Sequence, residues 1–200
     1  MVCAPPLGDL AGELAKELSR LACIVQQKGI CIVRGGADRV DDLEPLARSL
    51  HAHHLTVDPA IPGIPPRDED GWWAIRRERY AQWLAEPDAF ALLAEARGAP
   101  DRDAEPVGYA VVSIHGQDDS HRTGARFAEL QSLAVLDGMR GSGIGSALLQ
   151  AVYAELRDLG IDELAIGVLA TNHDAMRLYE REGFRPWVVI TLGKVPPAPA

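Results

Sequence analysis

Residues 128–149 read AELQSLAVLDGMRGSGIGSALL, a run in which a strand-like segment passes through a turn into a helix that begins among glycines. Gly141, Gly143 and Gly145 leave their backbone amides uncovered by side chains, and the first amides of a helix have no partner within it. Arg140 adds a positive charge beside them. The stretch therefore predicts a site for a phosphate-bearing ligand; the alternative is a tight connection that binds nothing.

The spacing of these residues separates three kinds of phosphate site. A dinucleotide-binding turn needs a glycine at its sixth position and a P-loop needs Lys followed by Ser or Thr, and GSGIGS supplies neither. Arg140, Gly143 and Gly145 instead meet the pattern Arg or Gln, two residues, Gly, one residue, then Gly or Ala. The stretch thus resembles the cofactor motif of GNAT acyltransferases, which implies acetyl-CoA as co-substrate.

The resemblance also implies how the cofactor is held. The strand before the turn would bond the pantetheine arm through its backbone, the amides of the turn would hold the pyrophosphate, and the Val135 amide would polarise the thioester carbonyl. The cofactor-binding residues implied are Leu133, Ala134, Val135, Arg140, Gly141, Ser142, Gly143, Ile144, Gly145, Ser146 and Asn172.

A second stretch, NHDAMRLYEREGF at 172–184, resembles another motif of the same family, in which an Asn opens a helix that carries a Tyr and ends at Gly-Phe. Asn172 and Tyr179 are seven residues apart and so share one face of that helix. A phenol is matched to a thiol leaving group, so Tyr179 is the candidate acid for the departing thiolate. The alternative is a ring that only packs against the cofactor arm.

Glu129 is the candidate general base, acting through a bound water on the ammonium group of the acceptor. Alternation along a strand predicts that Glu129 shares a sheet face with Gln131 and Leu133. Its position also matches the one where some protein-acetylating members of the family keep a catalytic Glu. The alternative is a surface Glu paired with Arg126 or Arg122.

Periodicity and turn residues predict the elements of the second half of the chain. They are strands at Phe90–Ala96, Val107–Ile114 and Phe127–Leu136, a helix at Gly143–Leu159 closed by Gly160, a strand at Glu163–Leu169, a helix at His173–Glu182 capped by Gly183, and a strand at Trp187–Leu192. Short polar connections predict an antiparallel meander for the first three strands. The strand–helix–strand order that follows predicts a parallel pair.

The first half reads as a helix, a strand, a helix, a proline-rich loop and a helix, at Asp9–Gln27, Ile30–Val33, Val40–His54, Asp58–Asp70 and Trp72–Leu84. The expected organisation is an N-terminal helical extension at 1–28, a GNAT acyltransferase domain at 29–193 and a disordered tail at 194–200. The fold that the resemblance implies is α/β (α+β). It is a mixed central sheet flanked by helices on both faces, whose fourth and fifth strands splay apart to form the CoA cleft.

Composition limits the classes of partner. The 200 residues carry a net charge of -9, which opposes nucleic acid and anionic membranes and mildly favours a cationic amine. No run resembles a spanning helix or a signal peptide, so we expect a cytoplasmic protein. The three cysteines are odd in number and lack CxxC spacing, which favours reduced thiols over a disulfide framework.

The motif HAHH places His51, His53 and His54 at an expected helix end. His51 and His54 could share a face as metal ligands, but the sequence offers no third ligand nearby. A solvated helix end is therefore favoured, and no metal is expected.

Aromatic and basic residues of the next expected helix leave two alternatives open. Trp72 and Trp73 could line an acceptor pocket or pack as plain core. Arg76, Arg77 and Arg79 could bind an anionic acceptor, but their spacing favours an ordinary exposed face.

Direct acetyl transfer needs an unprotonated amine, a polarised carbonyl and an acid for the thiolate, and each has a candidate here. We expect an N-acetyltransferase acting on a small-molecule or peptide amine, with dimerisation as one role for the N-terminal extension. Two other classes stay open: a non-catalytic acyl-CoA sensor, and an acyltransferase with a different acyl group or a hydroxyl acceptor.

Overall fold

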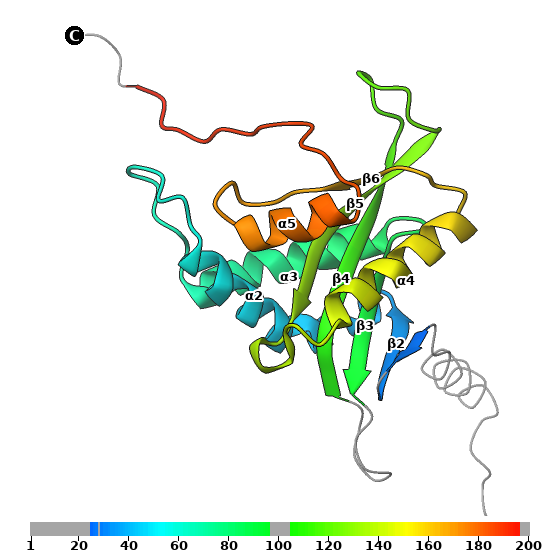
Figure 1. Ribbon diagram of the computed structural model, residues 1–200. Helices are drawn as coiled ribbons and strands as arrows, with labels where there is room; N and C mark the ends of the chain where they lie inside the picture. Colours follow the sequence, from blue (N-terminus) through cyan, green and yellow to red (C-terminus); the bar gives the residue numbers. More distant parts are fainter. Residues whose placement is uncertain (1–24, 28, 97–104, 197–200) are drawn as a thin grey trace, which may run out of the picture.

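The computed structural model describes residues 25–27, 29–96 and 105–196, which form a mixed sheet covered by helices on both faces (Figure 1). The described strands lie in the order β1-β2-β3-β4-β5-β6. Neighbouring strands are antiparallel except β5 and β6, which are parallel. The strands are β1 (Val25–Gln27), β2 (Ile30–Gly35), β3 (Phe90–Ala96), β4 (Glu105–Gly116), β5 (Arg126–Val135) and β6 (Leu164–Ile166).

Helices cover the two faces in pairs. In the described part of the chain, α2 (Glu44–Thr56) and α3 (Glu69–Ala85) pack on one face. The other face is covered by α4 (Ile144–Asp158) and α5 (His173–Arg181), as Figure 1 shows. Short 3-10 turns are η1 (Ala37–Arg39), η2 (Asp41–Leu43) and η3 (Asp137–Met139).

The central strands contribute side chains to two separate hydrophobic cores, because successive side chains of a strand point to opposite faces. Phe90 and Leu92 pack toward α4, whereas Leu93 and Val111 pack toward α2 and α3, and all four are fully buried. Strands covered on both faces read as continuous apolar runs rather than alternating ones. This explains the uninterrupted FALLA at the start of β3.

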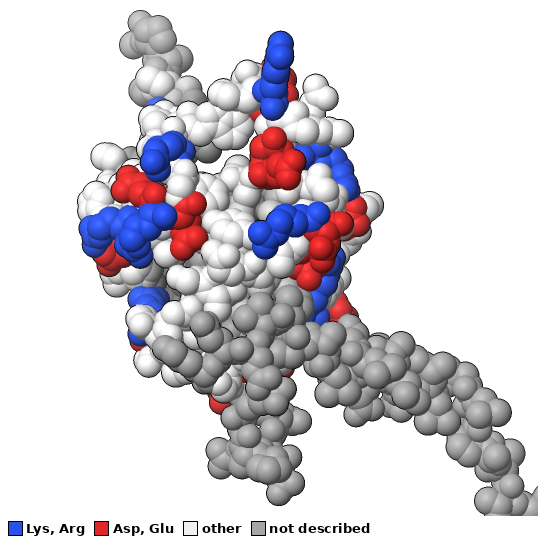
Figure 2. Space-filling view, turned by 45° about the vertical axis from the view of Figure 1, so that its right-hand side comes forward, with Lys and Arg blue, Asp and Glu red and all other residues white. Residues whose placement is uncertain are grey.

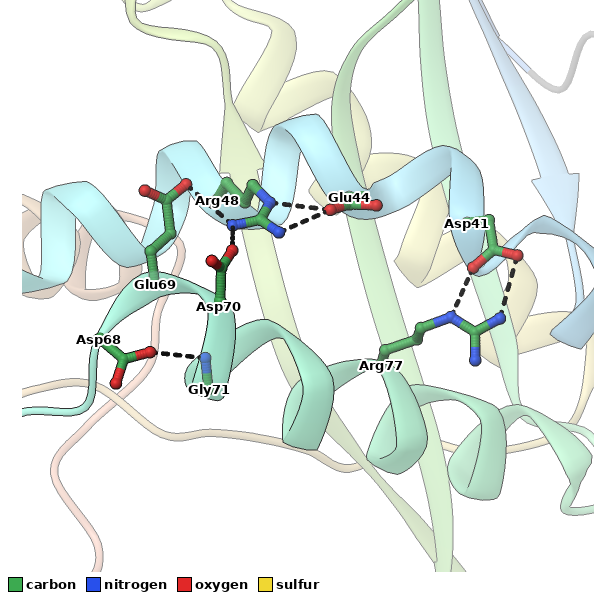
Figure 3. Close-up of polar contacts among 8 residues, drawn as sticks. All are labelled: Asp41, Glu44, Arg48, Asp68, Glu69, Asp70, Gly71 and Arg77. Carbon is green, nitrogen blue, oxygen red and sulfur yellow. Dashed lines mark hydrogen bonds and ion pairs between the residues drawn. The ribbon is translucent and has the colours of Figure 1, made fainter.

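Ion pairs hold α2 and α3 side by side on the outer surface (Figure 3). Arg48 of α2 lies 3.3 Å from Glu69 and 2.9 Å from Asp70, both in the first turn of α3. Farther along α3, Arg77 donates two hydrogen bonds to Asp41, at 2.7 and 3.1 Å. Solvent screens these exposed pairs, so the cluster sets the mutual orientation of the helices more than it stabilises the fold.

A β-bulge in β5 changes which face its side chains occupy. Val111 pairs with Ser132 but Val112 pairs with Leu130, which leaves Gln131 as one extra residue. Alternation therefore restarts after the bulge. Ala128 and Leu130 pack in the α4 core, and beyond the bulge that core receives Leu133 instead. The expectation that Glu129 and Leu133 share a face is thus wrong, because the extra residue reverses the alternation between them.

The two parallel strands part soon after they meet. Pairing of β5 with β6 runs from Ala128↔Leu164 to Leu130↔Ile166 and stops there. Over 131–135, β5 keeps its antiparallel partner β4 and has no strand on its other edge in the described part of the chain. The expected splay of two parallel strands is confirmed, and it begins at the bulge.

Most of the expected elements are confirmed. β3 has the expected bounds, and the antiparallel meander and the parallel β5–β6 pair are both present. Gly160 and Gly183 end α4 and α5 with φ of 67° and 96°, the left-handed conformation that glycine adopts without steric cost. The helix expected from Val40 begins with 3-10 turns and becomes α-helical at Glu44, and α3 starts earlier than Trp72, at Glu69.

The expectation of an N-terminal helix at Asp9–Gln27 is wrong for the last residues of that range. Val25–Gln27 form the strand β1 rather than the end of a helix, and 9–24 lie outside the described residues. β1 pairs with β2 through a tight hairpin, in which Gly29 has φ of 79°. A glycine within a two-residue connection between strands is a hairpin signal that competes with helical spacing.

Two expectations near the C-terminus also need correction. β6 spans only Leu164–Ile166, and the expected strand Trp187–Leu192 has no regular structure. Its side chains are exposed, with Ile190 at 90%. Strand propensity reflects the fit of a side chain against a half-buried sheet surface, and this run packs on none.

Cys31 in β2 is disulfide-bonded, so the expectation of reduced thiols is wrong for this residue. Among the described helices, none is long and apolar enough to cross a membrane.

Candidate active site

The glycine-rich turn has the backbone geometry that its sequence predicts. Gly141 and Gly143 have φ of 75° and 93°. Residues with side chains rarely adopt these angles, so glycine is required at both positions. A Cβ added at either one would meet no atom within 4 Å. The turn therefore faces open space, and its conformation does not come from tight packing.

The start of α4 offers free backbone donors to that space. Gly143 is the N-cap and forms no side-chain capping bond, and the first intrahelical bond runs from Ala147 N to Gly143 O at 3.0 Å. The amides of Ile144, Gly145 and Ser146 consequently have no partner within the helix. Together with the positive end of the helix dipole, they form a site for an anion.

Arg140 links this turn to the end of β5. Its Nε donates to Val135 O at 3.3 Å, and its guanidinium lies 2.7 Å from an oxygen of Asp137. Asp137 offsets part of the positive charge that the sequence assigned to the turn. The Nδ1 of His53, at the end of α2, lies 3.5 Å from the same guanidinium. Nothing in the sequence indicated that His53 lies beside Arg140, because the two residues are far apart in the chain.

The open edge of β5 exposes two of the three backbone groups expected to bond the cofactor arm. Leu136 N donates to Val107 O of β4 at 3.0 Å, so the preceding amide, that of Val135, points to the opposite edge. By the same alternation the Leu133 amide points to the opening, whereas the backbone of Ala134 pairs with Tyr109 of β4. Leu133 and Val135 therefore line the opening, and Ala134 does not.

Tyr179 is held by the structure that ends α5. Gly183 N donates to Glu180 O at 3.1 Å and Phe184 N donates to Tyr179 O at 3.0 Å, the two bonds of a Schellman motif. The rings of Tyr179 and Phe184 meet edge to face, with centroids 5.9 Å apart. Burial, and next the nearby Tyr153, raise the pKa of Tyr179 to about 12. The phenol is thus protonated at neutral pH.

Asn172 acts as the N-cap of the same helix. Its Oδ1 accepts a hydrogen bond from Ala175 N at 3.1 Å, and the side chain is buried. This contact fixes the start of α5 and through it the direction of Tyr179. A contact between Asn172 and the cofactor stays a prediction.

Glu129 lies in a polar network on the α2–α3 side of the sheet. Its Oε2 is 3.2 Å from His115 Nε2, and the same nitrogen is 2.9 Å from Ser113 Oγ. Ser113 Oγ also accepts from Gln131 Nε2 at 2.9 Å. The alternative partner Arg126 binds Asp88 instead. His115 gave no signal in the sequence, because it neighbours Glu129 only through the pairing of β4 with β5.

The two candidate catalytic residues lie on opposite faces of the sheet. Glu129 points to the side of α2 and α3, and Tyr179 packs against the α4 core. They do not contact each other. The opening between β5 and β6 begins two residues beyond Glu129 and separates the two sides. A molecule lying in the opening would be accessible to one residue from each face.

A second cluster on the α2–α3 side was not recognised as a unit from the sequence. The rings of His51 and Trp72 are stacked, with centroids 4.5 Å apart, and His51 Nε2 is 3.1 Å from Arg67 O. Trp73 is buried in the core, so the two tryptophans have different roles. His51 of the HAHH motif therefore packs against α3, so the expectation of a solvated helix end is wrong for this residue.

A surface cavity of about 370 Å³ lies between the C-terminal ends of α4 and α5. Tyr153, Leu156, Leu164 and Phe184 supply its apolar lining. It lies at the end of α4 remote from the glycine-rich turn, so it is separate from the anion site.

Figure 2 shows basic and acidic side chains intermixed around an uncharged area on one face of the molecule. The net charge of -9 is therefore not gathered into a single acidic patch on that face.

The order of elements, the parted strands and the glycine-led helix coincide with a known family. The model of the acetyltransferase (GNAT) family matches residues 51–184, which is more than half of the chain. The chain belongs to the GNAT acetyltransferase family. A mycothiol acetyltransferase from Thermobispora bispora is 31% identical over 164 residues, covering 72% of this chain and 52% of the relative.

Solved structures of the family share the fold. A GCN5-related N-acetyltransferase from Ralstonia eutropha JMP134 superposes with a TM-score of 0.62 at 20% identity, covering 83% of this chain and 99% of that one. An aminoglycoside N-acetyltransferase in complex with CoA gives a TM-score of 0.57 at 18% identity, covering 85% and 97%. The chain spans about half the length of the mycothiol acetyltransferases that it matches.

Proposed function

We propose that this chain is an N-acetyltransferase that moves the acetyl group of acetyl-CoA directly to a primary amine. The proposal rests on two sets of backbone groups without partners in the described part of the chain. One is the amides at the start of α4, the other is the unpaired edge of β5, and Arg140 lies between them. The first suits a pyrophosphate and the second suits an extended arm with amide groups. Coenzyme A carries both.

The residues present fit such a ligand. The amides from Gly141 to Ser146 would hold the pyrophosphate, since the turn faces open space and α4 has no side-chain cap. Leu133 and Val135 would bond the arm through their free amides. The Val135 amide also suits the thioester oxygen, because a fixed donor stabilises negative charge as it develops.

Tyr179 would supply the proton that the leaving thiolate needs. As the amine nitrogen bonds to the carbonyl carbon and the carbon–sulfur bond breaks, the sulfur takes the phenolic proton, and the proton that the nitrogen releases as the amide forms returns to the phenolate through solvent. Burial raises the pKa of this phenol to about 12, so it keeps its proton at neutral pH but is a weaker acid than free tyrosine, and the role rests on its position rather than on this shift. A purely packing role for Tyr179 is the alternative that mutation separates.

Glu129 would take the proton of the acceptor's ammonium group through a water molecule. Its location on the face opposite Tyr179 supports this assignment, since the acceptor would then approach from one side of the opening and the thiol would leave on the other. His115 would orient the carboxylate through the 3.2 Å contact. A base that is also positioned by a neighbour stays aligned with its substrate.

The acceptor class is proposed as a small-molecule amine. Relatives in sequence and in fold are named for mycothiol and for aminoglycosides, both of them small molecules. The fold hosts many acceptors, so the choice among amines depends on side chains of the α2–α3 face.

A thiol-release assay tests the proposal. The purified chain with acetyl-CoA and a panel of primary amines is expected to release CoA thiol in proportion to acetylated amine, and matched hydroxyl compounds are expected to give none. Calorimetric titration with CoA measures cofactor binding separately. Binding without turnover on any amine would support an acyl-CoA sensor, and turnover on hydroxyls alone would reject the amine acceptor.

A further inference from the structure

Arg76 of α3 is a half-buried cation with no anionic partner in the described part of the chain. Its guanidinium lies 5.3 Å from the centroid of the Trp72 ring and 5.6 Å from that of Tyr80. Within the described ranges, no carboxylate oxygen is within 4.0 Å of it. Arg48 and Arg77, in contrast, pair with carboxylates on the outer surface, as Figure 3 shows.

The neighbours of Arg76 place it over the part of β5 that is not paired with β6. Tyr80, one turn along α3, donates to or accepts from Ser132 Oγ at 2.6 Å, and Ser132 follows the bulge. Arg76 therefore faces the same side of the sheet as Glu129.

The end of α2 closes the other side of this region. Burial, and next the charges of His53 and Arg76, lower the pKa of His54 to about 4, so its ring is neutral at physiological pH. His53 contacts Arg140 at 3.5 Å, and Thr171 Oγ1, in the segment between β6 and α5, donates to Val57 O. This end of α2 thus lies beside both the glycine-rich turn and the segment that leaves β6.

A partly buried charge without a partner is costly, and the cost falls when an anion binds it. The guanidinium lies over two aromatic rings, which attract its charge without accepting hydrogen bonds from its edge N–H groups. A carboxylate or phosphate can accept two such bonds in parallel. Arg76 is thus prepared for an anion that the described residues do not provide.

We propose that Arg76 binds an anionic group of the acceptor, so that the preferred substrate carries a carboxylate or phosphate as well as the amine. The anion would rest on the edge of the Arg76 guanidinium, and the amine would lie toward Glu129. This inference rests on the proposed function for the identity of the ligand as an acceptor, but the anion site itself does not depend on turnover.

Anion binding is tested without catalysis. Titration of the protein with inorganic phosphate or acetate at constant ionic strength is expected to change tryptophan emission, because the Arg76 guanidinium lies 5.3 Å from the Trp72 ring centroid. Arg76→Gln should remove the response and Arg76→Lys should weaken it. Arg79→Gln is the matched control, since Arg79 lies on the same helix with its guanidinium 5.8 Å from the Trp83 ring centroid. An unchanged response in Arg76→Gln would overturn the site.

Acceptor preference is tested with pairs that differ in one charge, such as β-alanine against its amide and phosphoethanolamine against ethanolamine. Arg76→Gln should lower kcat/KM for the charged member about ten- to hundredfold and change the neutral member little. Equal losses for both members, or the same pattern in Arg79→Gln, would contradict the proposal. If no amine is acetylated at all, the proposed function fails, and the anion titration alone decides the role of Arg76.

Discussion

The imidazole Nε2 of His115 lies 3.2 Å from a carboxylate oxygen of Glu129, and the two side chains are each somewhat more than one-third exposed. Glu129→Gln keeps the size and hydrogen bonding of the side chain and removes the base. We expect kcat/KM to fall about 100-fold or more, as for loss of a general base. A kcat/KM within about threefold of wild type in Glu129→Gln would place the base elsewhere.

His115→Gln separates orientation from proton transfer. Because Glu129 keeps its carboxylate, we expect kcat to fall only about tenfold, less than in Glu129→Gln. The affinity for CoA should stay unchanged. A larger fall in kcat in His115→Gln than in Glu129→Gln would exchange the two roles.

Tyr179→Phe removes the phenolic hydroxyl with its proton and preserves the edge-to-face contact with Phe184. We expect at least a tenfold fall in kcat with unchanged CoA affinity, within the range for a general acid. Tyr153→Phe, the same deletion on the neighbouring α4, should have a much smaller effect. Turnover within about threefold of wild type in Tyr179→Phe would leave that ring a packing role only.

Ionisation of Tyr179 also sets a limit on the alkaline side. Burial raises the pKa of Tyr179 to about 12, so the phenol should keep its proton up to about pH 11. The enzyme should therefore have its general acid available over that whole range. Rate profiles of wild type and Tyr179→Phe should therefore differ in height and share their shape between pH 7 and pH 10. A limb near pH 9 that disappears in the variant would contradict the buried state of Tyr179.

Gly145 tests the cofactor site without straining the turn. A Cβ at this position would meet Val135 Cγ2 at 3.8 Å, an ordinary contact, whereas Gly141 and Gly143 have positive φ and would be strained by any side chain. Gly145→Val should therefore fold normally yet cover the free amides, weakening CoA binding at least about tenfold. Gly138→Ala, in η3 with open space around it, is the control. Equal CoA affinity in Gly145→Val would remove the turn from the site.

His54 makes stability depend on pH. Its pKa is lowered to about 4 in the folded chain and is near its ordinary 6.5 when unfolded. Between these values the unfolded chain binds a proton that the folded chain does not, so stability is full above pH 6.5 and is lost as pH falls toward 4. Because His54 is partly solvent-exposed, we expect about 1–2 kcal/mol rather than the full shift.

Denaturant unfolding of wild type and His54→Gln at pH 7 and pH 4.5 measures this contribution. The variant should lose less stability over that interval, whereas His173→Gln, at the exposed start of α5, should behave as wild type. The same loss in His54→Gln as in wild type would assign the pH dependence to other groups.

The sequence by itself determined the features that depend on short stretches of chain. Glycines at 141, 143, 160 and 183 have backbone conformations that other residues avoid. Turns and helix ends were therefore predictable from the residue type at single positions. The family motifs around Arg140 and Tyr179 are local in the same way. The open edge of β5 followed from the family resemblance, not from the residues alone.

Only the tertiary structure decided which distant residues meet. One extra residue at the bulge reversed the face of Leu133 relative to Glu129, and strand pairing brought His115 to that carboxylate. Three arginines of one helix looked equivalent in sequence, yet Arg77 pairs with Asp41, whereas Arg76 and Arg79 lie over tryptophan rings and have no carboxylate partner in the described part of the chain. Periodicity describes how one segment presents its side chains, whereas pairing register and burial depend on the neighbouring segments, which no local pattern contains.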